Sequence, residues 1–125
     1  MPETPKALLI ASAVIEGVVG LIAIILPGMA LMQAYPGIEN AMASEYAMRL
    51  AGTALLALGA LSWLVRDATD ASVLKPVLST LLAYNVLAVL NFGFLTMGPV
   101  PSALAPTILH LLLSGGFLYY LRKAD

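Results

Sequence analysis

The chain has 125 residues, of which 61% are hydrophobic and only 10% are charged, with six basic residues, seven acidic residues and no cysteine. Globular domains carry about 25% charged residues, so this composition excludes a water-soluble enzyme of ordinary surface, a disordered chain and a disulfide scaffold. The near balance of acidic and basic residues excludes nucleic-acid binding, which needs a surplus of basic charge. The length allows a single domain, residues 1–125.

Four apolar runs follow one another along the chain, at residues 7–26, 47–65, 77–97 and 103–121. Each is close to the roughly 20 residues that a helix needs to cross a ~30 Å hydrocarbon core. Because lipid cannot satisfy an open backbone, runs of this length must be helical. The sequence therefore predicts an all-α fold, a four-helix transmembrane bundle with helices near 7–26, 45–65, 76–97 and 102–121.

The first predicted helix ends at Pro27-Gly28, since glycine suits a left-handed cap and proline cannot continue the hydrogen-bond ladder. The connection that follows, residues 27–44, is long and rich in methionine and leucine. We expect a short interfacial segment at the outer membrane surface, with a short helix from about Ile38 that runs into the second span. This segment either packs as a lid on the end of the bundle or acts as a gate over a ligand site.

The other helix ends carry weaker signals. Ser44 is expected to be the N-cap of the second helix. Pro76 is expected in the first turn of the third helix, where its missing N–H costs nothing. Pro106 is expected near the first position of the fourth helix or at a first-turn kink.

The basic residues indicate the orientation of the bundle. Five of them flank the spans in three segments that an even number of spans brings to one side: Lys6, Arg66, Lys75, Arg122 and Lys123. The other two connections contain no basic residue, so the positive-inside rule places both termini in the cytoplasm. The first apolar run exceeds the 7–15 residues typical of a signal peptide. We therefore expect all four helices to remain in a bacterial inner (plasma) membrane.

Polar side chains inside the spans are costly and therefore informative. At 1.5 Å per residue, Glu16, Asn85 and His110 lie roughly 14–16 Å above the inner ends of their helices, near the midplane. Arg49 and Asn91 lie roughly 22–24 Å above the inner ends, nearer the outer surface. The sequence thus predicts a polar layer at mid-depth and a second layer above it.

Helical spacing predicts that these residues face the bundle axis together. Each helix carries a stripe of small and polar residues, including Ser12, Glu16 and Gly20 in the first, Arg49 and Gly52 in the second, Tyr84, Ala88 and Asn91 in the third, and Thr107, His110 and Ser114 in the fourth. The glycines are expected mainly to allow close approach of helices. We expect Glu16 and His110 to lie within direct or one-water reach of each other or of Asn85.

Each polar residue has more than one interpretation. Glu16 must be protonated or paired at this depth, either as a structural partner of His110, Asn85 or Arg49, or as a group that binds a ligand or a proton. Arg49 can extend to the outer interface or pair with Glu45.

The remaining polar residues point to no cofactor. Asn85 and Asn91 are typical of hydrogen bonds between helices. His110 is the only histidine and the chain has no cysteine, so no metal site is expected, and a haem with two histidine ligands needs a second chain.

Two resemblances point to known families. The second span, RLAGTALLALGALSWLVR from Arg49 to Arg66, resembles small uncharacterised bacterial four-span proteins grouped loosely with the DoxX-like membrane proteins, some of which accompany quinone-linked redox enzymes. The segment AVIEG around Glu16 resembles the first helix of small multidrug-resistance exporters, in which one membrane carboxylate is shared by drug and proton. That resemblance implies a dimeric, proton-coupled exporter.

Three functions remain open. The first is a non-enzymatic bundle that binds a membrane lipid or another lipid-like or quinone-like molecule, or serves as an accessory subunit in a homo-oligomer or larger membrane complex. Its candidate ligand-binding residues are Glu16, Arg49, Tyr84, Asn85, Asn91 and His110, with Arg49 and Asn91 expected to orient a polar head in an apolar cavity open to the outer leaflet. The second is the exporter that uses Glu16. The third is an intramembrane enzyme, isomerase-like, whose candidate acid–base pair is Glu16 and His110.

Overall fold

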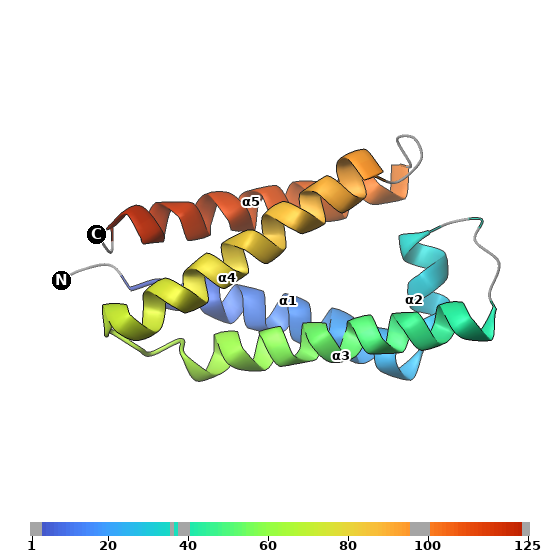
Figure 1. The fold of residues 1–125 in the computed structure, drawn as a ribbon, viewed down its shortest axis with the longest axis horizontal. Coiled ribbons are helices and arrows are strands. Elements are labelled where there is room, and N and C mark those ends of the chain that lie inside the picture. Colours follow the sequence, from blue (N-terminus) through green and yellow to red (C-terminus); the bar gives the residue numbers. More distant parts are fainter. Residues whose placement is uncertain (1–3, 36, 38–40, 96–100, 124–125) are drawn as a thin grey trace.

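The computed structural model describes residues 4–35, 37, 41–95 and 101–123. Its elements are helices α1 (Lys6–Ile25), α2 (Pro27–Ala34), α3 (Met42–Leu64) and α4 (Ala71–Leu90), the short π-helix η1 (Asn91–Leu95), and α5 (Pro101–Lys123), as Figure 1 shows. No strand occurs within the described residues. The predicted all-α fold is confirmed.

Four of the helices are long and apolar enough to cross a membrane. The candidate spans are Lys6–Ile25, Met42–Leu64, Ala71–Gly93 and Ala103–Lys123. Many large apolar side chains on these helices are exposed, and a bilayer rather than water can cover them. The chain is therefore an integral membrane protein built on a four-helix bundle.

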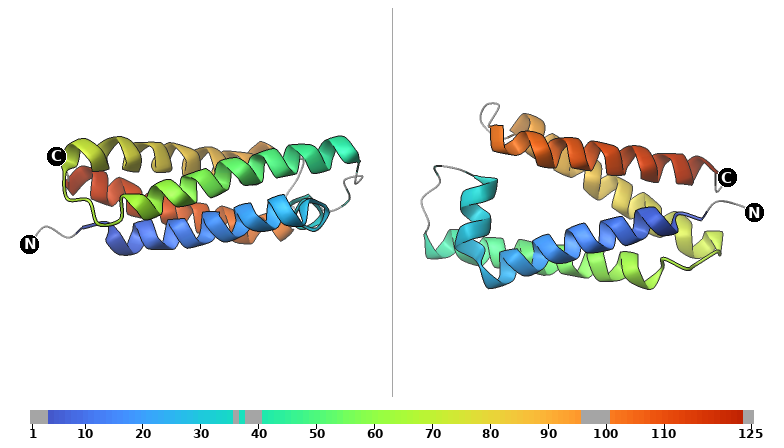
Figure 2. Two further views of the ribbon diagram at one scale, coloured as in Figure 1. Left: turned by 90° about the horizontal axis from the view of Figure 1, so that it is seen from below. Right: turned by 180° about the vertical axis from the view of Figure 1, so that it is seen from behind.

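The four long helices form two pairs. α1 runs along α3, and α4 runs along α5 (Figures 1 and 2). The pairs meet at the end of the bundle that carries both termini, and they diverge toward the opposite end. There α2 runs across the bundle, beside the C-terminal end of α1 and the N-terminal end of α3 (Figure 1). We call these the closed end and the open end of the bundle.

Glycines set the distance between α1 and α3. A Cβ atom on Gly52 would lie 2.7 Å from the carbonyl oxygen of Gly20, and one on Gly20 would lie 2.7 Å from the backbone nitrogen of Leu56. A Cβ atom on Gly59 would lie 2.9 Å from the backbone nitrogen of Gly17. The expected close approach is confirmed at Gly20, Gly52 and Gly59, because a side chain there would overlap the facing backbone. It is wrong for Gly17 and Gly115, where a Cβ atom would meet nothing within 4 Å.

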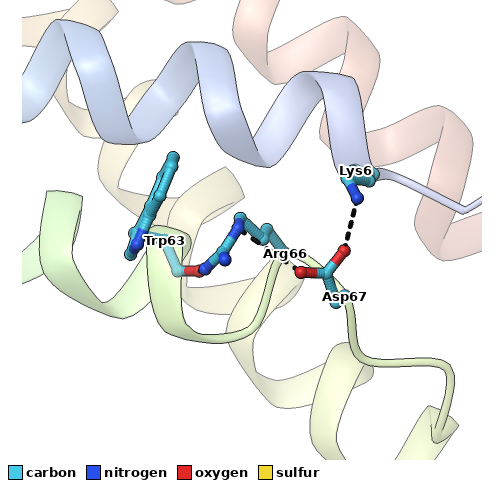
Figure 3. Close-up of polar contacts among 4 residues, drawn as sticks. All are labelled: Lys6, Trp63, Arg66 and Asp67. Atoms are coloured by element: carbon cyan, nitrogen blue, oxygen red, sulfur yellow. Dashed lines mark hydrogen bonds and ion pairs between the residues drawn. The ribbon is translucent and has the colours of Figure 1, made fainter.

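The apolar core lies at the closed end. It consists of Leu9, Leu74, Leu78, Leu81, Leu113 and Phe117, which come from the start of α1, the first half of α4 and the second half of α5. An ion pair adds to this junction: Lys6 Nζ lies 2.6 Å from Asp67 Oδ1, as Figure 3 shows. The core and the ion pair hold the two helix pairs together at this end.

Two helix boundaries at the open end of the bundle differ from the prediction. Pro27 does not only end α1; it occupies the first turn of α2, because a proline that stops one helix is also suited to start the next. The connection therefore has a helix at Pro27–Ala34, whereas the helix expected from about Ile38 falls partly on residues 38–40, outside the described residues. Ser44 is wrong as an N-cap, because α3 begins after the extended residue Ala41.

Three proline and helix-end predictions also need correction. α4 begins at Ala71, before Pro76, because Asp70 caps it by accepting from the backbone N–H of Ser72 at 2.8 Å. Pro76 thus lies inside α4. Pro106 likewise lies inside α5, which begins at Pro101. The predicted end of the third span, residue 97, lies outside the described residues.

Candidate functional site

The strongest polar contact between two helices joins α4 to α5. Nδ1 of His110 lies 2.7 Å from Oδ1 of Asn85, and Nδ2 of the same amide donates to the carbonyl oxygen of Leu81 at 2.7 Å. Asn85 is fully buried and His110 is 8% exposed. The structure thus brings together two of the three residues that depth alone assigned to one layer.

Two aromatic rings enclose the imidazole of His110. Tyr84 contacts it edge-on, with ring centroids 5.7 Å apart and planes at 84°. Phe92 stacks on it, with centroids 6.0 Å apart and planes at 8°. Because Phe92 belongs to η1, the π-helix completes one side of this arrangement.

Glu16 is buried in the middle of α1 and is 1% exposed. The hydroxyl of Ser12, one turn earlier, donates to its Oε1 at 3.0 Å. Its Oε2 is buried and has no hydrogen-bond partner among the described residues. Glu16 therefore does not pair with His110, Asn85 or Arg49, and the structural partnership expected with these residues is replaced by a local contact with Ser12.

Glu16, Asn85 and His110 are polar residues buried in the interiors of three of the described helices. The ring of Tyr84 on α4 contacts that of His110 on α5. We call Glu16, Tyr84, Asn85 and His110 the polar layer.

The two polar residues expected higher in the bundle make separate contacts. Arg49 is exposed, and its Nη1 donates to the carbonyl oxygen of Ile24 at 3.0 Å. That carbonyl is in the last turn of α1, where it needs an outside donor, and the cation complements the negative end of the helix dipole. No ion pair links Arg49 to Glu45 in the part of the chain that the structure describes. Arg49 is therefore a C-terminal cap of α1.

Asn91 lies at the start of η1 and is exposed. Its Nδ2 lies 3.5 Å from the hydroxyl oxygen of Tyr35, the residue after α2. This contact ties the end of α2 to the C-terminal end of α4. No contact among the described residues joins Asn91 to Arg49, so the structure does not bring together the pair that was expected to orient a polar head.

Sequence reasoning missed Phe92 and Tyr35. Phe92 falls outside the stripe of Tyr84, Ala88 and Asn91, because a π-turn adds one residue and shifts the helix face. Tyr35 lies in the 27–44 connection, whose apolar character indicates only that it is not a free loop. The sequence signal for Tyr35 is weak: a single tyrosine, whose hydroxyl can bond to another helix, directly follows a helix that begins with Pro27.

Several charged residues lie close together at the closed end. Arg66 lies with its guanidinium 3.9 Å from the centroid of the Trp63 ring and its Nε 3.4 Å from Asp67 (Figure 3). The hydrogen bond from Lys6 holds the pKa of Asp67 below its ordinary value. The backbone N–H of Ser72 likewise lowers the pKa of Asp70. These charges stabilise the turn between α3 and α4 and take no part in the polar layer.

The polar layer has a limited set of chemical capacities. Within the described residues, no group of three or more histidine, cysteine, aspartate or glutamate side chains could hold a metal ion. The layer instead offers a carboxyl, a phenol and an imidazole, from three different helices, in apolar surroundings. No known protein family, curated protein or solved structure matches the chain, so its function has to be argued from this layer.

Proposed function

We propose that the chain is a non-enzymatic membrane bundle that binds one lipid-like or quinone-like molecule between its two helix pairs. The observation that carries the proposal is the buried Oε2 of Glu16, which has no partner among the described residues. A polar group buried without a hydrogen bond costs about 1–3 kcal/mol in proteins. A bound molecule that supplies the missing partner removes this cost.

Two further atoms of the polar layer support the same conclusion. The hydroxyl of Tyr84 and Nε2 of His110 take part in no hydrogen bond within the described residues. Lipid tails offer no donor or acceptor to any of these atoms. A bound molecule with a polar group at this layer supplies a hydrogen-bond partner that the lipid tails lack.

The arrangement of the helices supports an apolar body for that molecule. Beyond Glu16, α1 buries only Gly20 and Ala23, which face α3, and it leaves its larger side chains exposed: Val18, Val19, Leu21, Ile22 and Ile25. The two helix pairs lie farther apart at this end of the bundle than at the closed end (Figure 1). Sites for apolar molecules combine many apolar side chains with few polar groups, and the second half of α1 supplies apolar side chains of this kind.

The proposed site lies deeper than the sequence alone suggested. Arg49 already donates a hydrogen bond to the carbonyl oxygen of Ile24, and Asn91 donates one to the hydroxyl of Tyr35. We therefore place the polar end of the ligand at the polar layer. In this proposal α2, held by the contact between Tyr35 and Asn91, covers the ligand at the open end of the bundle. The closed end, with its basic residues, faces the cytoplasm of a bacterial cell.

Native mass spectrometry of the purified protein tests the proposal. We expect one bound apolar molecule per chain, lost in the variant His110→Phe and retained in Ser114→Ala, whose side chain bonds only to the backbone of its own helix. A bare wild-type mass, together with unchanged thermal stability after complete delipidation, would contradict the proposal.

The exporter is a second candidate, because a buried carboxyl with one free oxygen is also what a shared proton and substrate site needs. Proteoliposomes with an imposed pH gradient distinguish the two functions. Substrate accumulation that the gradient drives and that Glu16→Gln abolishes would favour export. Ligand retention without such transport would favour the binding bundle.

A further inference from the structure

The hydrogen-bond pattern of Asn85 fixes the protonation of His110. The carbonyl oxygen of Leu81 can only accept, so the Asn85 amide must present its Nδ2 to Leu81 and its Oδ1 to His110. Because Oδ1 also only accepts, Nδ1 of the imidazole must carry the proton. No carboxylate contacts the ring among the described residues, and an imidazolium is costly inside a membrane. His110 is therefore neutral, and its Nε2 is a hydrogen-bond acceptor.

The contacts of Glu16 also indicate its protonation. Its Oε1 accepts from Ser12, and no cationic side chain contacts the carboxyl in the part of the chain that the structure describes. A carboxylate buried in this way would be strongly unfavourable, so the group is neutral. With Oε1 engaged as an acceptor, Oε2 carries the proton and is a donor. The polar layer thus offers one donor from α1, one acceptor from α5, and the Tyr84 hydroxyl, which can serve as either.

We propose that the ligand is an uncharged apolar molecule that binds through a hydroxyl group, donating to Nε2 of His110 and accepting from Glu16. A hydroxyl is both a donor and an acceptor, and so it satisfies both free groups. A ketone or quinone carbonyl only accepts and leaves Nε2 unpaired. The inference rests on the proposed binding function and names the chemical class of its ligand: long-chain alcohols, phenols or hydroquinones.

The distribution of cations supports an uncharged head. Arg49 donates to the end of α1, and Lys6 and Arg66 belong to the charged turn at the closed end. No lysine or arginine contacts Glu16, Tyr84 or His110 among the described residues. A phosphate head group needs cations or several N–H donors, which this layer does not supply.

Nitrogen NMR of the single histidine tests the inference directly. Protein labelled with ¹⁵N-histidine, delipidated in detergent, is titrated with 1-hexadecanol, 2-hexadecanone and hexadecyl phosphate. Before addition, we expect the proton on Nδ1 and a bare Nε2. Hexadecanol should shift the Nε2 resonance in the direction of a hydrogen-bonded nitrogen and raise the melting temperature, whereas the ketone and the phosphate should do neither at the same concentration.

Two variants separate the donor from the acceptor. Glu16→Gln keeps an N–H donor and should bind hexadecanol within a few-fold of the wild type. Glu16→Leu removes the donor and should weaken binding about tenfold, the usual effect of one lost hydrogen bond. Ser114→Ala is the matched control and should bind as the wild type does.

The outcomes distinguish this inference from the function on which it rests. A proton on Nε2, a preference for the ketone, or equal binding of all three probes overturns the hydroxyl inference and leaves a binding bundle in place. If none of the three probes binds, the inference is overturned and the proposed function loses its support as well.

Discussion

Replacing one buried glycine should separate α1 from α3. In Gly52→Ala, the new Cβ atom lies 2.7 Å from the carbonyl oxygen of Gly20 and 2.8 Å from the Cβ of Ala23. Ordinary contacts of this kind begin at 3.4 Å, so relieving the 2.7 Å contact moves the facing atoms apart by about 0.7 Å. Overpacking of this size costs about 1–3 kcal/mol. We expect the free energy of unfolding to fall by that amount.

Gly115 provides the matched control on α5. A Cβ atom there meets nothing within 4 Å, so Gly115→Ala should be neutral or should stabilise the helix by up to ~1 kcal/mol through helix propensity. Both variants are measured by equilibrium unfolding in SDS titrated into mixed micelles, followed by circular dichroism. If Gly52→Ala is as stable as Gly115→Ala, the close packing of α1 on α3 is refuted.

Three further predictions follow from single contacts. Arg49→Ala should lower the free energy of unfolding by about 1 kcal/mol through the loss of the cap on Ile24. Leu50→Ala, at an exposed side chain of the same helix, is the control in the same SDS titration; equal loss in both would contradict the capping role. Tyr35→Phe should speed hydrogen exchange of the α2 amides, because α2 loses its bond to Asn91; unchanged exchange would show that this bond does not hold α2. The Lys6–Asp67 ion pair lowers the pKa of Asp67 from 3.8, so its contribution to stability is fully present above pH ~4 and is lost as the pH falls below this value. Asp67→Asn should therefore flatten the stability profile at pH values below that ordinary pKa, and an identical profile for both proteins would contradict the pairing.

The spans could be predicted because they follow from hydropathy and length. The contact between Asn85 and His110 could also be predicted, because each residue's depth follows from its distance to a charged helix end. The partner of Glu16 could not. The rotation of α1 about its axis is set by packing on α3 through Gly20 and Gly52, and a serine one turn away offers the carboxyl a local donor.

The ends of helices were harder to predict than their interiors. Pro27 satisfies the rules for both the end of one helix and the start of another, so the pattern alone hides α2. Asp70 and Ser44 are both acceptable caps by type, and only Asp70 serves as one, since Ala41 adopts the extended backbone that starts α3. The π-helix changes the side-chain spacing after Leu90, and therefore a strict 3.6-residue period misplaces Phe92.

A crystal structure from a lipidic mesophase, at a resolution that shows bound lipid, would reveal the bound molecule itself. We expect one elongated molecule between the α1–α3 and α4–α5 pairs, with its polar end within hydrogen-bond distance of Oε2 of Glu16 and Nε2 of His110. Helix pairs packed against each other along their whole length, with no molecule at the polar layer and with Glu16 bonded to another protein side chain, would contradict this expectation.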